Sequence, residues 1–176
     1  IMGVWHSSTK ENCWGRGKDL VPEKYFREGI EVHNDYAKVL EDKSMLQSDS
    51  YFKEIFESIV PALEPEIDSK NTAMIGSSMG ALATLYAVAQ MPERFSTALA
   101  LSPHWPFGGN PLVEKTINSL PLPGTHKVWM SHGTKGLDSD YAPFQMYADK
   151  LMSEHGYHAH NYISRVYPRS GHNERS

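Results

Sequence analysis

The sequence has a single cysteine, Cys13, among its 176 residues. One cysteine cannot close a disulfide within the chain, which excludes a small scaffold held together by disulfides. No apolar run approaches the roughly 20 residues that span a bilayer as a helix, so no membrane partner is predicted. Positive charge is not in excess either, because 17 Lys and Arg stand against 21 Asp and Glu, for a net charge of -4. Nucleic acid, which needs clustered positive charge, is therefore not an expected partner.

What is present fits one globular domain over residues 1–176. Hydrophobic residues make up 40% of the chain, and no repeat or low-complexity tract divides it. Strand-like and helix-like stretches alternate along the chain, which favours an α/β fold with a mostly parallel central sheet. Strands are expected at 1–5, 72–75, 96–101, 127–131 and 158–167. Helices are expected at 50–64, at 81–90, after the Asn110-Pro111 pair and at 141–154. Residues 15–22 are expected to form a loop.

The most informative motif is GSSMG at residues 76–80, which has the form G-x-S-x-G. An apolar run precedes it and a helical pattern follows it, the context of a nucleophile elbow. In such an elbow the central serine adopts a strained backbone conformation with its hydroxyl exposed, and the flanking glycines fit the crowded turn. Ser78 is therefore the candidate nucleophile. The alternative is an ordinary turn in which Ser77 or Ser78 only caps the helix.

The sequence also contains candidate partners for this serine. They follow it in the order acid and then histidine, as in hydrolases that have a nucleophile elbow. Serine hydrolysis needs a base for the hydroxyl proton and a carboxylate that orients the base, each in a loop after a later strand. Asp138 lies in the loop after the strand at 127–131, and His172 lies in the loop after the last strand. The alternatives are a solvated loop carboxylate for Asp138 and a surface histidine for His172. Asp140 fits the role of a cap for the helix at Tyr141 better than Asp138 does.

Aromatic and histidine side chains elsewhere give one further candidate. Trp105 and Phe107 follow the strand at 96–101. In α/β-hydrolases, the enzymes in which the nucleophile elbow is found, this loop often lines the acyl or alcohol pocket. Trp105 is the candidate substrate contact, and core packing is the equal alternative. His158 and His160 would point to one face of a strand, but no third ligand follows at a clear spacing, so no metal site is predicted.

Together these residues resemble the putative esterase family of α/β-hydrolases. That family includes enterochelin-type siderophore esterases, S-formylglutathione hydrolases, feruloyl esterase modules and mycolyltransferases. The resemblance rests on the run GSSMGALATLYA from Gly76, on Leu-Ser-Pro with Trp105 close behind, on GTKGLD ending at Asp138, and on GHNE from Gly171. It extends from about residue 72 to the end of the chain and is patchier before that.

The resemblance implies an α/β-hydrolase-type three-layer sandwich and assigns a role to each candidate. Ser78 would be the nucleophile, His172 the general base and then acid, and Asp138 the orienting acid. The backbone N–H of Met79 would be one oxyanion donor. No cofactor is implied.

The resemblance also implies that the early strands of this fold are missing from the chain. The helix at 50–64 would be the one before the nucleophile strand, and residues 1–5 would form the fourth strand. The third strand, which normally lies beside the nucleophile strand and leads into the second oxyanion donor, would then lie before Ile1. We therefore expect residues 1–176 to be a single, truncated domain.

The predicted function is hydrolysis of a small-molecule carboxylic ester through an acyl-enzyme intermediate. Two alternatives are open. One is acyl transfer, in which an alcohol replaces water at the same acyl-enzyme. The other is an inactive fragment of the fold that serves as an interaction module. The sequence does not select among siderophore lactones, sugar or feruloyl esters, and thioesters as substrates.

Overall fold

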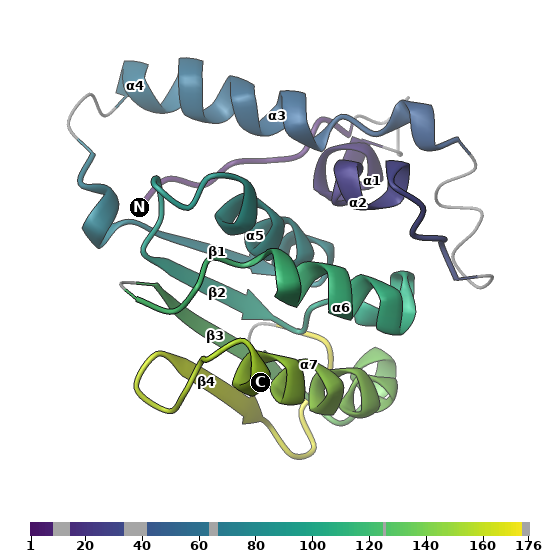
Figure 1. The fold of residues 1–176 in the computed structure, drawn as a ribbon. Coiled ribbons are helices and arrows are strands. Elements are labelled where there is room, and N and C mark those ends of the chain that lie inside the picture. The colour runs from purple at the N-terminus through teal and green to yellow at the C-terminus, as the bar shows by residue number, and fades with distance from the viewer. Residues whose placement is uncertain (9–14, 34–41, 64–66, 125, 174–176) are drawn as a thin grey trace.

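The computed structural model describes residues 1–8, 15–33, 42–63, 67–124 and 126–173. Four parallel strands form one sheet in the order β1-β2-β3-β4 (Figure 1). The strands are β1 (Ala73–Ser77), β2 (Thr97–Leu101), β3 (Lys127–His132) and β4 (Tyr162–Val166). The first three confirm the predicted strands to within two residues. The fourth is shorter than predicted, because residues 158–161 form a turn before it.

The helices that connect the strands all lie on one face of the sheet. They are α5 (Met79–Gln90), α6 (Gly109–Ser119) and α7 (Ala142–Glu154), and α6 begins just before its predicted start. Sequential parallel strands joined by right-handed crossovers place every crossover on the same side, as Figure 1 shows. The covered face carries Ala98, Ala100, Val128 and Met130, all buried. The predicted α/β class is thus confirmed, but of the three layers expected for the sandwich the described residues form the sheet and one helical layer.

Short helices precede the sheet and pack beside α5. They are α1 (Gly15–Leu20), α2 (Glu23–Arg27), a 3-10 turn (Lys43–Met45), α3 (Ser48–Glu54), a π-helical turn (Ile55–Ile59) and α4 (Val60–Leu63). The last three form the helix predicted at 50–64. Pro61 accounts for the π-helical turn, because it lacks the N–H that would continue the α-helical pattern. Further 3-10 turns lie at Ser69–Asn71, Trp105–Phe107 and Gly136–Asp140.

Two predictions near the N-terminus were wrong. Residues 1–5 do not form a buried strand, and Trp5 is 86% exposed. An apolar run becomes a strand only where a neighbouring strand pairs with it, and no described strand lies beside this one. Residues 15–20 form helix α1 rather than a loop. Gly15 serves a close approach there, since a Cβ on it would lie 2.3 Å from the backbone nitrogen of Ser8.

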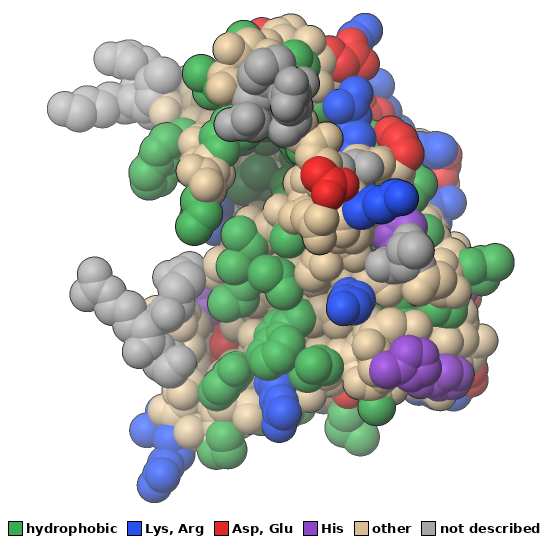
Figure 2. Space-filling view, turned by 90° about the vertical axis from the view of Figure 1, so that its left-hand side faces the viewer, with side chains coloured by type: hydrophobic (Ala, Val, Ile, Leu, Met, Phe, Trp, Pro, Cys, Tyr) green, Lys and Arg blue, Asp and Glu red, His purple; other side chains and the backbone are tan. Residues whose placement is uncertain are grey.

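The other face of the sheet carries an apolar row. Ile75, Leu99, Trp129 and Ile163 lie in register across the four strands, and Ile75 is 64% exposed. The first three line an open hollow of about 360 Å³. Figure 2 shows one side of the molecule, with hydrophobic side chains gathered near its centre. Among the described strands none pairs with the outer edge of β1.

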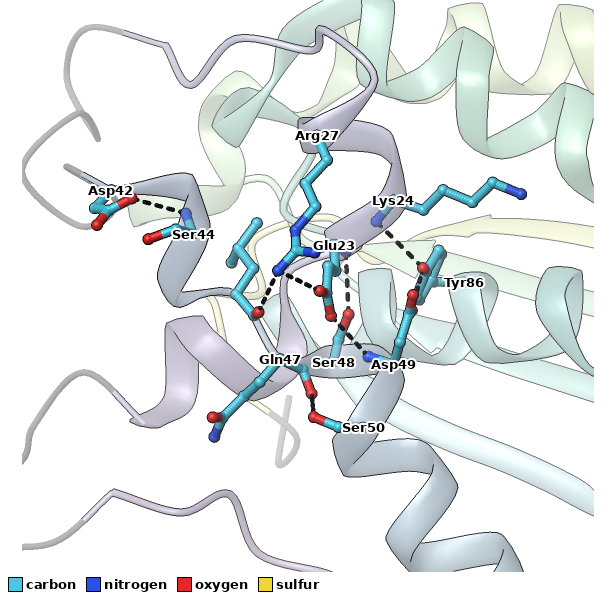
Figure 3. Close-up of polar contacts among 11 residues, drawn as sticks. Glu23, Lys24, Arg27, Asp42, Ser44, Gln47, Ser48, Asp49, Ser50 and Tyr86 are labelled. Carbon is cyan, nitrogen blue, oxygen red and sulfur yellow. Dashed lines mark hydrogen bonds and ion pairs between the residues drawn. The ribbon is translucent and has the colours of Figure 1, made fainter.

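A polar network fastens α2 to α3 (Figure 3). The backbone N–H of Glu23 donates to the hydroxyl of Ser48 over 3.0 Å, and the backbone N–H of Asp49 donates to the carboxylate of Glu23 over 3.1 Å. Arg27 pairs with the other oxygen of the same carboxylate at 2.6 Å. Glu23 and Ser48 thus satisfy backbone donors at the starts of each other's helices, which fixes the two short helices relative to one another.

Tyr86 connects this network to α5, the helix that follows the elbow. Its fully buried hydroxyl donates to Asp49 and accepts the backbone N–H of Lys24 (Figure 3). Burial, together with the bond to Asp49, raises the pKa of the Tyr86 hydroxyl well above its ordinary value. Burial also raises the pKa values of Tyr25 and Tyr157 to about 12. The native fold therefore favours the neutral form of these tyrosines.

We expect this burial to make the protein sensitive to alkaline pH. A raised pKa contributes stability that is fully present below about pH 10 and is lost as the pH rises through the folded-state values. Tyr86→Phe should lose about 1 kcal/mol at pH 8, because a buried hydrogen bond is removed. Between pH 8 and pH 11, the free energy of unfolding should fall less in this variant than in the parent. Urea unfolding at both pH values measures the difference, with Tyr147→Phe, whose hydroxyl bond is exposed, as control. An equal alkaline loss in both variants would contradict this account.

Candidate active site

The candidate residues gather at one end of the sheet. Ser78 directly follows β1 and Ser102 directly follows β2, while Asp138 and His172 lie in the segments after β3 and β4. The carboxyl ends of parallel strands lie at the same end of the sheet, which is where open α/β sheets bind ligands. The chain therefore brings four polar side chains, far apart in sequence, to this end of the sheet.

Ser78 has the backbone of a nucleophile elbow. Its φ of 60° and ψ of -120° are unfavourable for a residue with a side chain, and its N–H donates to the carbonyl of Leu101 over 2.9 Å. The side chain makes no capping bond to α5, so the interpretation of Ser78 as a mere helix cap is not supported. Gly76 makes the turn possible, since a Cβ there would lie 2.1 Å from the carbonyl oxygen of Gly80. A Cβ on Gly80 would meet nothing within 4 Å.

The two glycines of the motif are therefore expected to differ on substitution. Gly76→Ala should lower the free energy of unfolding by about 2–3 kcal/mol, because the methyl group overlaps rigid backbone. Gly80→Ala should be neutral or stabilising by up to about 1 kcal/mol, since alanine is the better helix former. Urea unfolding of both variants tests this, with each serving as the other's control. Equal losses would show that the turn is crowded at both positions.

Met79 begins helix α5, where backbone donors lack partners within the helix. The carbonyl of Ser78 accepts the N–H groups of Ala81 and Leu82 at 3.0 and 3.3 Å, so the N–H of Met79 precedes the first bond inside the helix. The partial positive charge of a helix N-terminus lies at the same point. This N–H is suited to stabilise negative charge beside the Ser78 side chain.

Asp138 is a buried carboxylate with a donor at each oxygen. Its Oδ1 lies 2.5 Å from Nδ1 of His172. Its Oδ2 accepts the backbone N–H of Gly133 over 2.6 Å and the hydroxyl of Ser102 over 2.8 Å. Burial alone would raise the pKa of Asp138, but the hydrogen bonds from His172, Gly133 and Ser102 outweigh it and hold the pKa below its usual range. Asp138 is therefore a charged acceptor at neutral pH.

His172 contacts Asp138 rather than Asp140. Asp140 is exposed, accepts a hydrogen bond from the hydroxyl of Ser139 and makes no capping bond to α7, so the capping role predicted for it is not seen. The His172 side chain is 22% exposed, and its bound Nδ1 leaves Nε2 as the nitrogen available for proton transfer. In the described part of the chain the hydroxyl of Ser78 has no hydrogen bond.

A buried histidine that the sequence did not single out lies behind the elbow. The backbone N–H of His104 donates to the carbonyl of Ser78 over 3.3 Å, and its Nδ1 hydrogen-bonds the hydroxyl of Tyr141. The Tyr141 ring in turn packs edge-on against His172, with 5.8 Å between centroids. Burial, with smaller contributions from His172 and Arg16, lowers the pKa of His104 to about 4, so its ring is neutral at pH 7. Its place directly after the Ser102-Pro103 pair that follows β2 was the available signal.

Other predicted site residues lie elsewhere. Trp105 is fully buried, and its indole N–H donates to Gln145 over 3.2 Å, which agrees with core packing, the alternative that the sequence left open. His158 and His160 lie in the turn before β4 and not on a strand. Among the described residues, no three His, Cys, Asp or Glu side chains are arranged to hold a metal ion.

None of the described helices is long and apolar enough to cross a membrane. Cys13 lies outside the described residues.

Comparison with known proteins identifies relatives of this arrangement. Residues 24–175 match the model of the putative esterase family. No match was found among curated proteins. The enterobactin hydrolase IroE has a similar structure, with a TM-score of 0.64 and 17% identity over 90% of this chain and 58% of that one. The CE1 ferulic acid esterase from the anaerobic fungus Anaeromyces mucronatus gives a TM-score of 0.55 and 17% identity over 82% of this chain and 52% of that one.

The enterobactin esterase FES from Shigella flexneri is similar as well. Its TM-score is 0.53 and its identity 20%, over 71% of this chain and 34% of that one. Identities this low establish a shared fold, that of α/β-hydrolase esterases. The chain spans between about a third and three fifths of the length of these three proteins.

Proposed function

Because this chain belongs to the putative esterase family, we propose that it hydrolyses carboxylic esters with Ser78, His172 and Asp138 as its catalytic side chains. The observation that carries the proposal is the 2.5 Å contact of buried Asp138 with His172, at the sheet edge where Ser78 holds an elbow conformation. A serine, a histidine and a carboxylate in these roles are the requirements of nucleophilic acyl transfer.

In the proposed mechanism, Nε2 of His172 takes the hydroxyl proton while Oγ of Ser78 bonds to the ester carbonyl carbon. The carbonyl oxygen becomes an oxyanion, which the N–H of Met79 stabilises at the N-terminus of α5. The intermediate then expels the alcohol, which receives the proton from His172, and leaves an acyl group on Ser78. Water, deprotonated by His172, attacks the acyl carbon, and the bond to Oγ of Ser78 then breaks, Oγ receiving the proton from His172 as the acid is released. Asp138 keeps the proton on Nδ1 and stabilises the charged ring.

The proposed substrates are small-molecule esters, and no cofactor takes part. The similar structures include an enterobactin esterase and a ferulic acid esterase, which suggests aromatic as well as short acyl groups for a first panel. We expect turnover of p-nitrophenyl acetate or methyl ferulate, with a burst of the first product as the acyl-enzyme accumulates. Acid quenching followed by peptide mass analysis should find the acyl group on the Ser78 peptide. Turnover with no acylated Ser78 would contradict the mechanism.

The same experiment distinguishes hydrolysis from acyl transfer. An added alcohol competes with water for the acyl-enzyme, so the product ratio reports which acceptor the site prefers. Free acid as the main product, even at high alcohol concentration, is the outcome expected for a hydrolase. Formation of the new ester as the main product would identify an acyltransferase with the same catalytic side chains.

A second candidate function is that of an interaction module. The apolar row from Ile75 to Ile163 favours it, as does the edge of β1 with which no described strand pairs, because such surfaces are normally covered in a stable protein. A chain that is folded by circular dichroism but neither turns over esters nor acylates Ser78 would support this second function.

A further inference from the structure

The strand beside the elbow is followed directly by a second serine with a positive φ. Ser77 and Leu101 are the last residues of β1 and β2 that pair with each other. Ser78 and Ser102, each one residue further on, therefore occupy equivalent positions. Their φ angles are 60° and 46°. Each N–H donates to a carbonyl at the end of the next strand, from Ser78 to Leu101 over 2.9 Å and from Ser102 to Ser131 over 2.6 Å. Such φ values are uncommon for residues other than glycine, so a second strained turn follows β2.

This conformation directs the Ser102 hydroxyl to the carboxylate of Asp138. The hydroxyl donates to Oδ2 over 2.8 Å, beside the N–H of Gly133 at 2.6 Å. Oδ1 remains for Nδ1 of His172. The last torsion of an aspartate is broad, so one carboxylate oxygen must be held for the other to keep a fixed direction. Two donors from different loops hold Oδ2 and so aim Oδ1 at the histidine.

We propose that Ser102 is a positioning residue that acts on His172 through Asp138, an inference that rests on the proposed function. Backbone geometry alone does not account for a serine at this place, since glycine would adopt a φ of 46° with less strain. The serine adds a hydroxyl to a buried, charged acceptor, and hydrogen bonds to charged groups are the stronger ones.

Ser102→Gly separates the hydroxyl from the backbone. It removes the donor, which costs stability, and it also relieves the backbone strain, which restores some, so the two effects oppose each other and thermal stability should change little. We expect kcat to fall on the order of tenfold with KM little changed, because orientation of the base matters in the transition state. Ser102→Ala should lose as much activity while keeping the strain. Wild-type kcat in Ser102→Gly would overturn the proposal.

Ser96→Ala is the matched control. Ser96 precedes the opposite end of β2, and its hydroxyl donates to the backbone carbonyl of Thr72 over 3.3 Å, away from the site. We expect kcat within about twofold of the parent, as for substitutions away from special features. A tenfold loss in this control as well would attribute the Ser102 effect to general disturbance of the strand and overturn the proposal.

A double-mutant cycle with Asp138→Asn tests whether Ser102 acts through Asp138. In the asparagine background His172 is no longer oriented by a carboxylate, so adding Ser102→Gly should cost less than about twofold in kcat. A further tenfold loss in that background would mean that Ser102 acts through another group, against the proposal.

An activity-independent measurement separates this inference from the proposed function. The proton between Nδ1 of His172 and Asp138 should give a low-field NMR resonance in the parent chain. The resonance should broaden or disappear in Ser102→Gly and persist in Ser96→Ala. Persistence in Ser102→Gly would overturn the positioning role, even if the parent turns over no ester. Absence of ester turnover that depends on Ser78 would, by contrast, contradict the proposed function.

Discussion

Replacing Ser78 by alanine is expected to lower kcat for ester hydrolysis by a factor on the order of 10⁴ or more. The alanine cannot form the bond to the carbonyl carbon, so no acyl-enzyme accumulates and the initial burst disappears. The side chain makes no hydrogen bond to a described residue and no capping bond, so its removal should leave the fold intact. Steady-state kinetics with the best ester of the panel, together with circular dichroism, measures both effects.

Ser77→Ala is the matched control for that variant. Ser77 is the neighbouring serine of the same motif and the last residue of β1, where it lines the open hollow. Alternation along the strand turns it away from the helical layer. We expect its kcat to stay within about twofold of the parent. Loss of activity in Ser77→Ala with retention in Ser78→Ala would show that the elbow was assigned to the wrong serine.

Replacing Asp138 by asparagine is expected to lower kcat on the order of 10⁴-fold. In the parent, the carboxylate accepts from three donors at once, on Ser102, Gly133 and His172. An asparagine oxygen facing Ser102 and Gly133 leaves an NH₂ group toward Nδ1 of His172. That group requires an acceptor, so the ring proton moves to Nε2, where it blocks removal of the serine proton. The pH-independent kcat of the variant measures the effect.

Asp140→Asn is the control for the second prediction. Asp140 lies two residues further on in the same 3-10 turn, but it is exposed and bonds only the Ser139 hydroxyl among the described residues. Its kcat should remain within about twofold of the parent. A large loss in Asp140→Asn with little change in Asp138→Asn would mean that the two carboxylates exchange roles when substrate binds.

Asp138 also makes the stability of the fold depend on pH in the acid range. Its folded-state pKa is lowered, so the stability it adds is present above the ordinary aspartate value of about 4. That stability is lost as the pH falls below about 4 and through the folded-state value. Asp138→Asn removes the titrating group and should therefore lose less stability than the parent over the same acid range.

The sequence was most informative where position follows from strand succession. The parallel order of β1 to β4 brings their carboxyl ends together, so the segments after β3 and β4 could be identified as the places for Asp138 and His172. The elbow was predictable for a different reason. The motif at 76–80 contains its own steric requirement, visible as the close approach of Gly76 to Gly80.

Other features depend on contacts that no local pattern reveals. The run at 1–5 looks like a buried strand in isolation, but strand formation depends on a partner and the described sheet provides none beside it. Trp105 was a plausible pocket residue until the position of α7 placed Gln145 against its indole. The contacts of Ser102 with Asp138 and of Tyr141 with His172 arise only from the register of β2 with its neighbours and from the packing of α7.

In the proposed mechanism Ser78 is a nucleophile that His172 activates. Labelling with a fluorophosphonate probe, followed by peptide mass spectrometry, tests this activation, with His172→Ala run beside the parent chain. We expect the label on the Ser78 peptide of the parent, and we expect labelling to be lost or strongly slowed in the histidine variant. A folded parent chain that takes up no label, or takes it up at another serine, would contradict the mechanism.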